Sequence, residues 1–122
     1  MYIMFIEDNP ELRMVYSTFL KKNWISVLEC EDWVQALNEI ENHSFDLILM
    51  DIMMPKMDWL EFVEKLTELV PAFELDKIKI WAFSNVADIS SVKNKRISKR
   101  LVKSSTPPSR LLKIIKEEFS LT

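Results

Sequence analysis

The sequence predicts an α/β protein built on a parallel five-stranded sheet with helices on both faces. Apolar runs of strand length begin near residues 2, 25, 47, 78 and 101, and a segment with helical spacing follows each of them. Regular alternation of this kind is typical of a parallel sheet, because a crossover helix must return the chain before the next strand begins. The crossovers are expected to be right-handed.

The first repeat is the most clearly marked. Tyr2 to Ile6 is an apolar run that predicts a strand, and Asn9-Pro10 supplies a helix cap followed by proline at the first helical position. Apolar residues then recur at helical spacing, so a helix is predicted from about Pro10 to Lys22. Because the chain has no glycine, Asn23 is expected to end this helix in the left-handed conformation.

The second and third repeats follow the same pattern. A short strand is predicted at Ile25–Leu28, and the third strand, Leu47–Met50, is apolar without polar alternation, as in a strand covered on both faces. Asp58 can cap the third helix, and Pro71 ends it. The second helix is marked by Val34, Leu37 and Ile40, and the third carries Phe62, Val63, Leu66, Leu69 and Val70.

The last two repeats are less regular. Pro71 to Lys77 is predicted to be a loop, Ile78–Phe83 the fourth strand, and Leu101-Val102 the centre of a short fifth strand. A strongly basic run, Lys93 to Arg100, precedes that strand, and it is interpreted as a solvated face or as a contact for an acidic protein. A short fourth helix is marked by Val86, Ile89 and Val92, and the last helix by Thr106-Pro107-Pro108 followed by Leu111, Leu112, Ile115 and Phe119.

Composition bounds the class of protein. The 122 residues fit one domain, and 48% hydrophobic residues are enough for a real core. A net charge of −3 argues against a large nucleic-acid footprint, and no apolar run approaches the roughly 18 residues of a membrane span. The single cysteine, Cys30, excludes an internal disulfide, which fits a reducing compartment. No signal peptide is recognisable either, so a cytoplasmic protein is expected.

The absence of glycine excludes two kinds of phosphate site. Neither a Walker loop nor a dinucleotide-binding fingerprint can be built without glycine. Asparagine and aspartate are expected to take the turn positions that need positive φ. Any phosphate site must therefore use side chains and ordinary backbone.

Polar side chains stand at the ends of four predicted strands: Glu7-Asp8, Asp51, Ser84 and Lys103. The carboxyl ends of parallel strands share one edge of the sheet, where ligands bind, so these residues are expected to be neighbours. Taken singly, each has an ordinary explanation, such as a helix-dipole charge for Glu7-Asp8, a surface lysine for Lys103 or a turn residue for Ser84. Only their convergence raises them to a candidate site.

Together these groups are equipped for phosphoryl chemistry. Three carboxylates placed close together repel one another, and a hard divalent cation such as Mg²⁺ relieves that repulsion through oxygen ligands. Lys103 offers a cation for phosphate and Ser84 a hydroxyl donor. A carboxylate in such surroundings can attack a phosphoryl group and form an acyl phosphate.

The chain resembles the receiver domain of response regulators, the phosphoacceptor module of two-component signalling. The resemblance covers essentially the whole chain. It implies a flavodoxin-like fold with strand order 2-1-3-4-5. It rests on Phe-Ile-Glu-Asp-Asn at 5–9, Asp-Leu-Ile-Leu-Met-Asp-Ile-Met-Met-Pro-Lys-Met-Asp at 46–58, Ala-Phe-Ser-Asn at 82–85 and Val-Lys-Ser at 102–104.

The resemblance also implies a role for each site residue. Asp51 would be the phosphorylated aspartate, and Asp8 would bind Mg²⁺ directly, with Glu7 helping through water and the backbone carbonyl of Met53 as a third ligand. Ser84 would hydrogen-bond the phosphoryl group, and Lys103 would pair with it. The donor would be the phosphohistidine of a sensor histidine kinase or a phosphotransfer protein, and the chain would be no enzyme beyond its own phosphorylation and autodephosphorylation.

Three departures from the family pattern stand out. Trp59 stands where glycine is usual, and its ring is expected on the surface or against a partner. Arg100 stands where an aromatic residue usually moves inward with the hydroxyl residue, which questions that coupling. Ser104 replaces the proline that usually follows the lysine, so no cis peptide is expected there.

Three hypotheses follow. The first is a stand-alone receiver over residues 1–122 without an effector domain, whose output is a protein contact through the fourth helix, fifth strand and fifth helix. The second is a degenerate receiver that binds partners without phosphorylation, as Arg100 and the segment after Lys103 suggest. The third is a small phosphatase of the haloacid-dehalogenase type, which would need an acid where Met53 stands.

Overall fold

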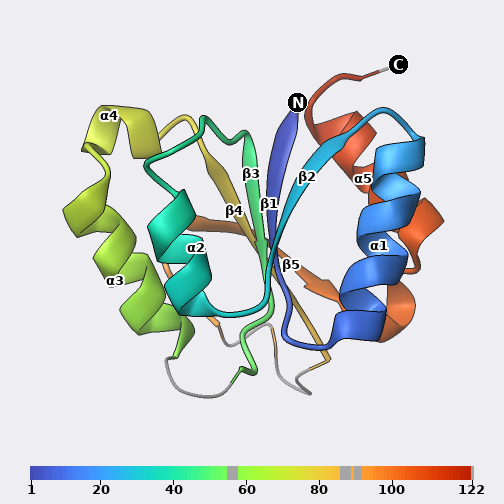
Figure 1. The fold of residues 1–122 in the computed structure, drawn as a ribbon, viewed down its shortest axis with the longest axis horizontal. Helices are drawn as coiled ribbons and strands as arrows, with labels where there is room; N and C mark the ends of the chain where they lie inside the picture. The colour runs from blue at the N-terminus through green and yellow to red at the C-terminus, as the bar shows by residue number, and fades with distance from the viewer. Residues whose placement is uncertain (55–57, 86–88, 90–91, 122) are drawn as a thin grey trace.

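The computed structural model describes residues 1–54, 58–85, 89 and 92–121, and these form a sheet covered by helices on both faces (Figure 1). All strand pairs are parallel, and the strand order is β2-β1-β3-β4-β5. The predicted fold class and strand order are therefore confirmed. The strands are β1 (Tyr2–Ile6), β2 (Ser26–Cys30), β3 (Leu47–Met50), β4 (Lys79–Ser84) and β5 (Ile97–Val102).

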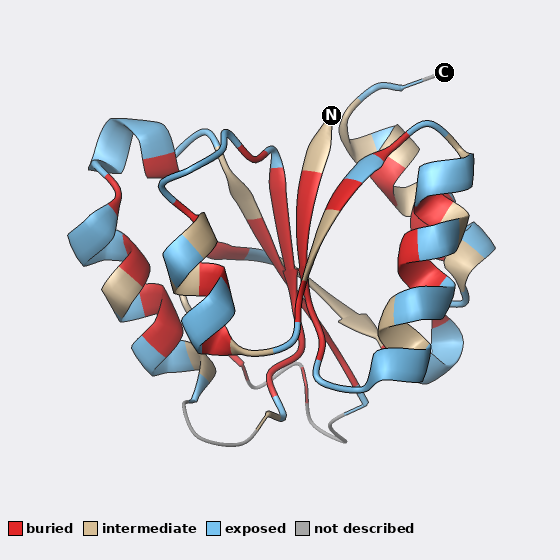
Figure 2. Cartoon of the chain, in the orientation of Figure 1, coloured by how far each residue is buried: buried red, intermediate tan, exposed pale blue. Residues whose placement is uncertain are grey.

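The helices divide between the two faces of the sheet. One face is covered by α1 (Pro10–Lys22) and α5 (Pro108–Glu118), and the other by α2 (Trp33–Glu39), α3 (Trp59–Leu69) and the short α4 (Ala72–Leu75) (Figure 1). Burial is concentrated in the strands and on the inner sides of the helices (Figure 2). The sheet therefore separates two hydrophobic cores.

Side-chain caps set the beginnings of two helices. The Asn9 side chain accepts hydrogen bonds from the backbone N–H groups of Glu11 and Leu12 at 3.0 and 3.1 Å. The Asp58 carboxylate accepts from the N–H of Glu61 at 2.7 Å. These bonds satisfy donors that have no partner within the helix, and both helices begin where the sequence predicts.

The turn after α1 differs from the prediction. Asn23 has a φ of −104°, and Trp24 takes the left-handed conformation instead, with a φ of 68°. The Asn23 side chain donates to the carbonyl of Phe19 at 2.9 Å, and its backbone N–H donates to that of Leu20 at 3.0 Å. These bonds keep Asn23 on the last turn of the helix, so the chain reversal falls on the next residue.

One further local prediction was wrong. The predicted loop from Pro71 to Lys77 contains α4, because the carbonyl of Pro71 accepts from two following N–H groups and starts a helical turn. The inner face of α2 begins with the buried Trp33, while Val34 is 55% exposed. The predicted helix marked by Val86, Ile89 and Val92 lies largely outside the described residues.

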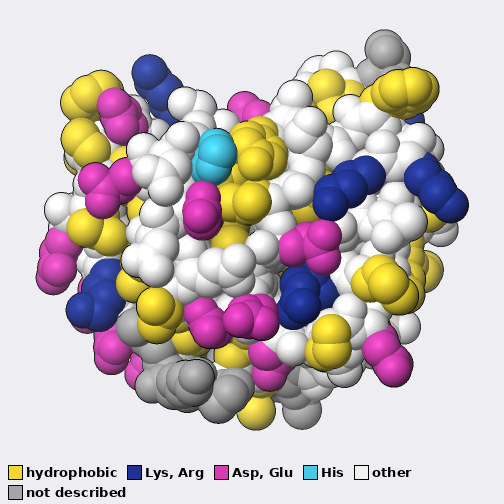
Figure 3. Space-filling model, viewed as in Figure 1, with side chains coloured by type: hydrophobic (Ala, Val, Ile, Leu, Met, Phe, Trp, Pro, Cys, Tyr) yellow, Lys and Arg dark blue, Asp and Glu magenta, His cyan; other side chains and the backbone are white. Residues whose placement is uncertain are grey.

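β5 extends into the segment that the sequence marks as strongly basic. Two cations of this segment pair with carboxylates: Arg96, just before β5, with Asp76, and Lys99, whose Nζ lies 3.6 Å from a carboxylate oxygen of Glu118. On the face in Figure 3, Lys and Arg side chains stand apart from one another among acidic and uncharged groups. Nearby carboxylates therefore neutralise part of the positive charge of the basic run.

None of the helices in the described ranges is long and apolar enough to span a bilayer.

Candidate functional site

The carboxyl ends of β1, β3, β4 and β5 meet around a pocket of about 350 Å³. All the residues predicted from the strand ends line it, so the structure brings together side chains from four separate strands. The lining consists of Glu7, Asp8, Asn9, Leu12, Asp51, Met53, Ser84, Asn85 and Lys103.

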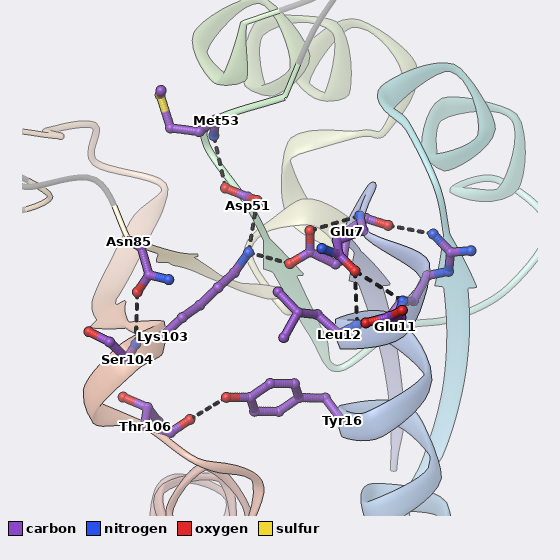
Figure 4. Close-up of polar contacts among 12 residues, drawn as sticks. Glu7, Glu11, Leu12, Tyr16, Asp51, Met53, Asn85, Lys103, Ser104 and Thr106 are labelled. Atoms are coloured by element: carbon purple, nitrogen blue, oxygen red, sulfur yellow. Dashed lines mark hydrogen bonds and ion pairs between the residues drawn. The ribbon is translucent and has the colours of Figure 1, made fainter.

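Asp51 is placed directly after β3 and is only 5% exposed. Its backbone N–H donates to the carbonyl of Ile6 at 3.1 Å, which extends the pairing of β3 with β1 by one residue. One carboxylate oxygen, Oδ1, accepts from the N–H of Met53 at 2.9 Å, and Oδ2 accepts from Lys103 Nζ at 2.8 Å (Figure 4). Both oxygens are thus oriented by hydrogen bonds.

Glu7 and Asp8 bring two more carboxyl groups to the same place. Ligand oxygens of Glu7, Asp8 and Asp51 all lie within 4.8 Å of one another. Glu7 is buried, and its Oε2 accepts from the N–H of Asn9 at 3.2 Å, whereas Asp8 is exposed at the pocket mouth. The Glu7 carboxyl group is therefore buried and held by hydrogen bonds, whereas that of Asp8 is open to solvent.

Lys103 bridges the two buried carboxyl groups. Its Nζ donates to Glu7 Oε1 as well as to Asp51, and it stands 5.8 Å from the centre of the Phe83 ring. Burial by itself would lower the pKa of Lys103, but the two carboxylate partners outweigh it and raise the pKa. Burial raises the pKa of Glu7, and the ammonium of Lys103 offsets only part of that effect.

The donor set fits a hard divalent cation. Three carboxyl groups face a single ammonium, so the cluster keeps an excess of acidic groups even with Lys103 in place. Carboxylate oxygens are the ligands that Mg²⁺ prefers, and a small site of one to three carboxylates leaves room for water and phosphate oxygens. Glu7, Asp8 and Asp51 could therefore hold Mg²⁺.

Ser84 and Met53 complete the predicted set. Ser84 is 1% exposed at the end of β4, where it lines the pocket. The Met53 side chain is 67% exposed, and its backbone N–H holds Asp51, while its carbonyl stays a predicted ligand.

Three residues that the sequence did not single out hold this site together. Arg13 Nη1 donates to the carbonyl of Glu7 at 2.7 Å, and Asn85 Oδ1 accepts from the N–H of Ser104 at 2.7 Å. The Tyr16 hydroxyl donates to the carbonyl of Thr106 at 2.8 Å. Asn85 follows Ser84 directly and could have been suspected. No periodicity reveals the partners of Arg13 or Tyr16, because each contact depends on the tertiary fold.

The departures from the family pattern have definite positions. Arg100 is half-buried, and its Nε donates to the carbonyl of Val92. Trp59 is also half-buried and packs against the core beneath α2 and α3, so the expectation of a surface or partner-facing ring was wrong. The described backbone contains no cis peptide bond, which agrees with the prediction for Lys103-Ser104.

Known proteins share this sequence pattern. The family described as "Response regulator receiver domain" matches residues 3–116. Chemotaxis protein CheY of Bacillus subtilis is 34% identical over 68 residues, which cover 55% of this chain and 57% of that protein. Response regulator GtcR of Aneurinibacillus migulanus is 35% identical over 65 residues, or 53% of this chain and 27% of that protein.

Solved structures share the fold. A CheY-like receiver domain protein of Methanospirillum hungatei superposes with a TM-score of 0.80 at 25% identity, covering 98% of this chain and 93% of that one. Chemotaxis response regulator CheY4 of Vibrio cholerae gives a TM-score of 0.78 at 22% identity, over 95% and 96% of the two chains. With the family match extending over nearly the whole sequence, this chain belongs to the response regulator receiver domains of two-component signalling.

Proposed function

We propose that Asp51 accepts a phosphoryl group from a phosphohistidine of a sensor histidine kinase or phosphotransfer protein, and that the phosphorylated chain signals through a protein contact. The setting of the Asp51 carboxylate carries this proposal. It is 5% exposed yet lines a pocket, Lys103 Nζ lies 2.8 Å away, and two other carboxyl groups are within reach. A solvated capping aspartate would have none of these features.

The transfer is a substitution at phosphorus. A carboxylate oxygen of Asp51 attacks the phosphorus, the P–N bond to the donor imidazole breaks, and its electron pair stays on that nitrogen, so a ring protonated at its other nitrogen leaves as neutral imidazole. Lys103 is placed to pair with the phosphoryl oxygens, since its ammonium already touches Asp51. Ser84 is placed to donate its hydroxyl to the same group.

The acidic cluster would bind the divalent cation that assists such a transfer. Glu7, Asp8, Asp51 and the carbonyl of Met53 would hold Mg²⁺, which when bound neutralises charge on the transferred oxygens. A receiver solved with Mg²⁺ and beryllofluoride, TrrA of Thermotoga maritima, shares this fold with a TM-score of 0.77 at 20% identity over 95% and 96% of the two chains. That complex motivates the choice of probes below.

The output would be a change in protein binding. A phosphoryl group adds negative charge next to Lys103, which begins the turn after β5, and next to Ser84, which ends β4. We place the output surface on the segment after β4, on β5 and on α5. A shift between two conformations of that surface would carry the signal.

Tryptophan fluorescence tests the proposal. Mg²⁺ and then beryllofluoride, which mimics a phosphoryl group, are titrated into the wild type and into Asp51→Ala, since Trp59 is the first residue of α3, the helix that follows Asp51 in the chain, and Trp81 lies in β4. We expect the wild type to respond to each ligand and Asp51→Ala not to respond to beryllofluoride. Calorimetry that finds neither ligand bound to the wild type would overturn the proposal.

A second candidate function rests on Arg100. The bond from its Nε to the carbonyl of Val92 ties β5 to the segment before it, which would restrain the output surface in one conformation. The chain would then bind a partner whether or not Asp51 is phosphorylated. Failure to trap phosphate on Asp51, with the partner still bound, would favour this second candidate function.

A further inference from the structure

We infer that Tyr16 is a positioning residue for Lys103, acting through the turn that follows β5. The inference rests on the proposed function, in which the ammonium of Lys103 serves the phosphoryl group. Tyr16 does not line the pocket, so it acts only by holding the main chain that carries Lys103.

The Lys103 side chain is long, and where its ammonium lies depends on where its backbone sits. Lys103–Ser105 form a short 3₁₀ helix, η2, and the N–H of Thr106 donates to the carbonyl of Lys103 at 3.0 Å. The sequence here is Ser-Ser-Thr, with no ring to restrict φ. Hydrogen bonds must therefore fix the turn.

Tyr16 supplies the most protected of these bonds. Its hydroxyl donates to the carbonyl of Thr106 at 2.8 Å, and the two residues are 6% and 3% exposed. Water cannot compete easily at such a site, and a carbonyl left without its donor there is costly. The tether joins the middle of α1 to the turn that carries Lys103, as Figure 4 shows.

The Phe83 ring contacts both Tyr16 and the ammonium of Lys103. The Tyr16 ring meets the Phe83 ring edge-on with centroids 5.2 Å apart, and Lys103 Nζ lies 5.8 Å from the Phe83 centroid. Tyr16 is therefore held in place by the ring beneath the ammonium that it positions.

Other bonds hold the turn less securely. Asn85 Oδ1 accepts from the N–H of Ser104 at 2.7 Å, but both residues are exposed. The hydroxyl of Thr106 donates to the carbonyl of Val102 at 2.7 Å, which shapes the turn without tying it to the rest of the protein. Among the contacts of the described residues, the Tyr16 hydroxyl is the buried link between this turn and a helix.

Tyr16→Phe removes the hydroxyl and keeps the ring. We expect phosphorylation of Asp51 by phosphoramidate, a small-molecule donor, to slow by about tenfold, because a small displacement of a charged group has a large effect on transfer. Mg²⁺ affinity should not change, since Glu7, Asp8 and Asp51 are untouched. Ile115→Val, in the same core, controls for a general loss of stability.

A double-mutant cycle separates positioning from a structural role. If Tyr16 acts through Lys103, Tyr16→Phe should have no further effect on the phosphorylation rate in a Lys103→Ala background. Equal slowing in both backgrounds, or slowing of Ile115→Val to the same extent, would overturn the inference. Failure of the wild type to be phosphorylated would instead overturn the proposed function.

Discussion

Trp24 occupies a backbone conformation that usually favours glycine. Its φ is 68°, and its side chain is 95% exposed, so the ring contributes little burial in return. A residue with a Cβ atom loses about 1–2 kcal/mol in this conformation. Glycine at this position would avoid the cost in the folded state. Its greater freedom in the unfolded chain would offset about 0.5–1 kcal/mol of that gain.

We therefore expect Trp24→Gly to raise the free energy of unfolding by about 0.5–1 kcal/mol. Urea unfolding followed by far-UV circular dichroism measures this, and Trp24→Ala is the control, because it removes the ring but keeps Cβ. An equal gain in both variants would mean that the ring, not the backbone, is unfavourable.

Lys103 acts as the internal counter-ion of Glu7 and Asp51. Replacing it with methionine leaves two buried carboxyl groups without their cation, and breaking a buried pair in this way costs about 3–5 kcal/mol. We expect Lys103→Met to lower the melting temperature strongly without metal and to recover more than the wild type when Mg²⁺ is added, since a ligand of the folded state stabilises it.

Lys79→Met is the matched control for this experiment. Lys79 also pairs with a carboxylate, that of Glu118 at 3.1 Å, but its side chain is 42% exposed. A surface pair contributes at most about 1 kcal/mol, and this one is remote from the acidic cluster. If both variants lost equal stability and responded equally to Mg²⁺, Lys103 would not be the counter-ion of the site.

At the scale of the element, Asp58 begins α3 just after the loop that carries Asp51 and Met53. We expect Asp58→Ala to lower the free energy of unfolding by about 1 kcal/mol, because the N–H of Glu61 loses its acceptor. Denaturant unfolding measures the loss. Asp58→Asn keeps a capping oxygen and should retain most of the stability, whereas an equal loss in both would point to charge rather than capping.

Elements with strong local signals could be predicted from the sequence. The helix from Pro10 to Lys22 has a cap, a proline at its first position and a regular apolar face, so its ends were predicted to the residue. β3 is a short apolar run that ends on a carboxylate, and its place in the centre of the sheet follows.

Elements whose stability comes from tertiary contacts were predicted less well. β5 reads as a basic run, but the cations of its residues Lys99 and Arg100 find acceptors on Glu118 and Val92. The single turn of α4 is too short to show periodicity. The strand-end rule placed the charged groups of the site correctly, while Tyr16 and Arg13 escaped it because they act from a helix on distant backbone atoms.

At the scale of the whole molecule, three buried groups that titrate at alkaline pH favour their protonated forms in the folded state. Burial raises the pKa of the Cys30 thiol to about 12 from an unfolded value of 9.0, and burial also raises the pKa of Tyr16 from 10.0. The pKa of Lys103 is raised from 10.5, because its carboxylate partners outweigh its burial. Between the unfolded and folded pKa values, the folded state binds more protons.

Stability should therefore fall as the pH rises above about 9, first through Cys30, by up to about 1.4 kcal/mol per pH unit, and then through Tyr16 and Lys103. Urea unfolding at pH values from about 8 to about 11 tests this. Cys30→Ala should be less stable at neutral pH but should lose much less further stability than the wild type between pH 9 and 10. A wild type with constant stability up to pH 10 would contradict the expectation.

The two cores on either side of the sheet have a practical consequence. Each contains one fully buried tryptophan, Trp33 at the start of α2 and Trp81 in β4, while Trp24 is open to solvent and Trp59 is half-buried. The chain has no other tryptophan. Each core therefore has its own intrinsic fluorescence probe. Variants that keep only Trp33 or only Trp81 would show whether the two cores unfold as one cooperative unit or one after the other.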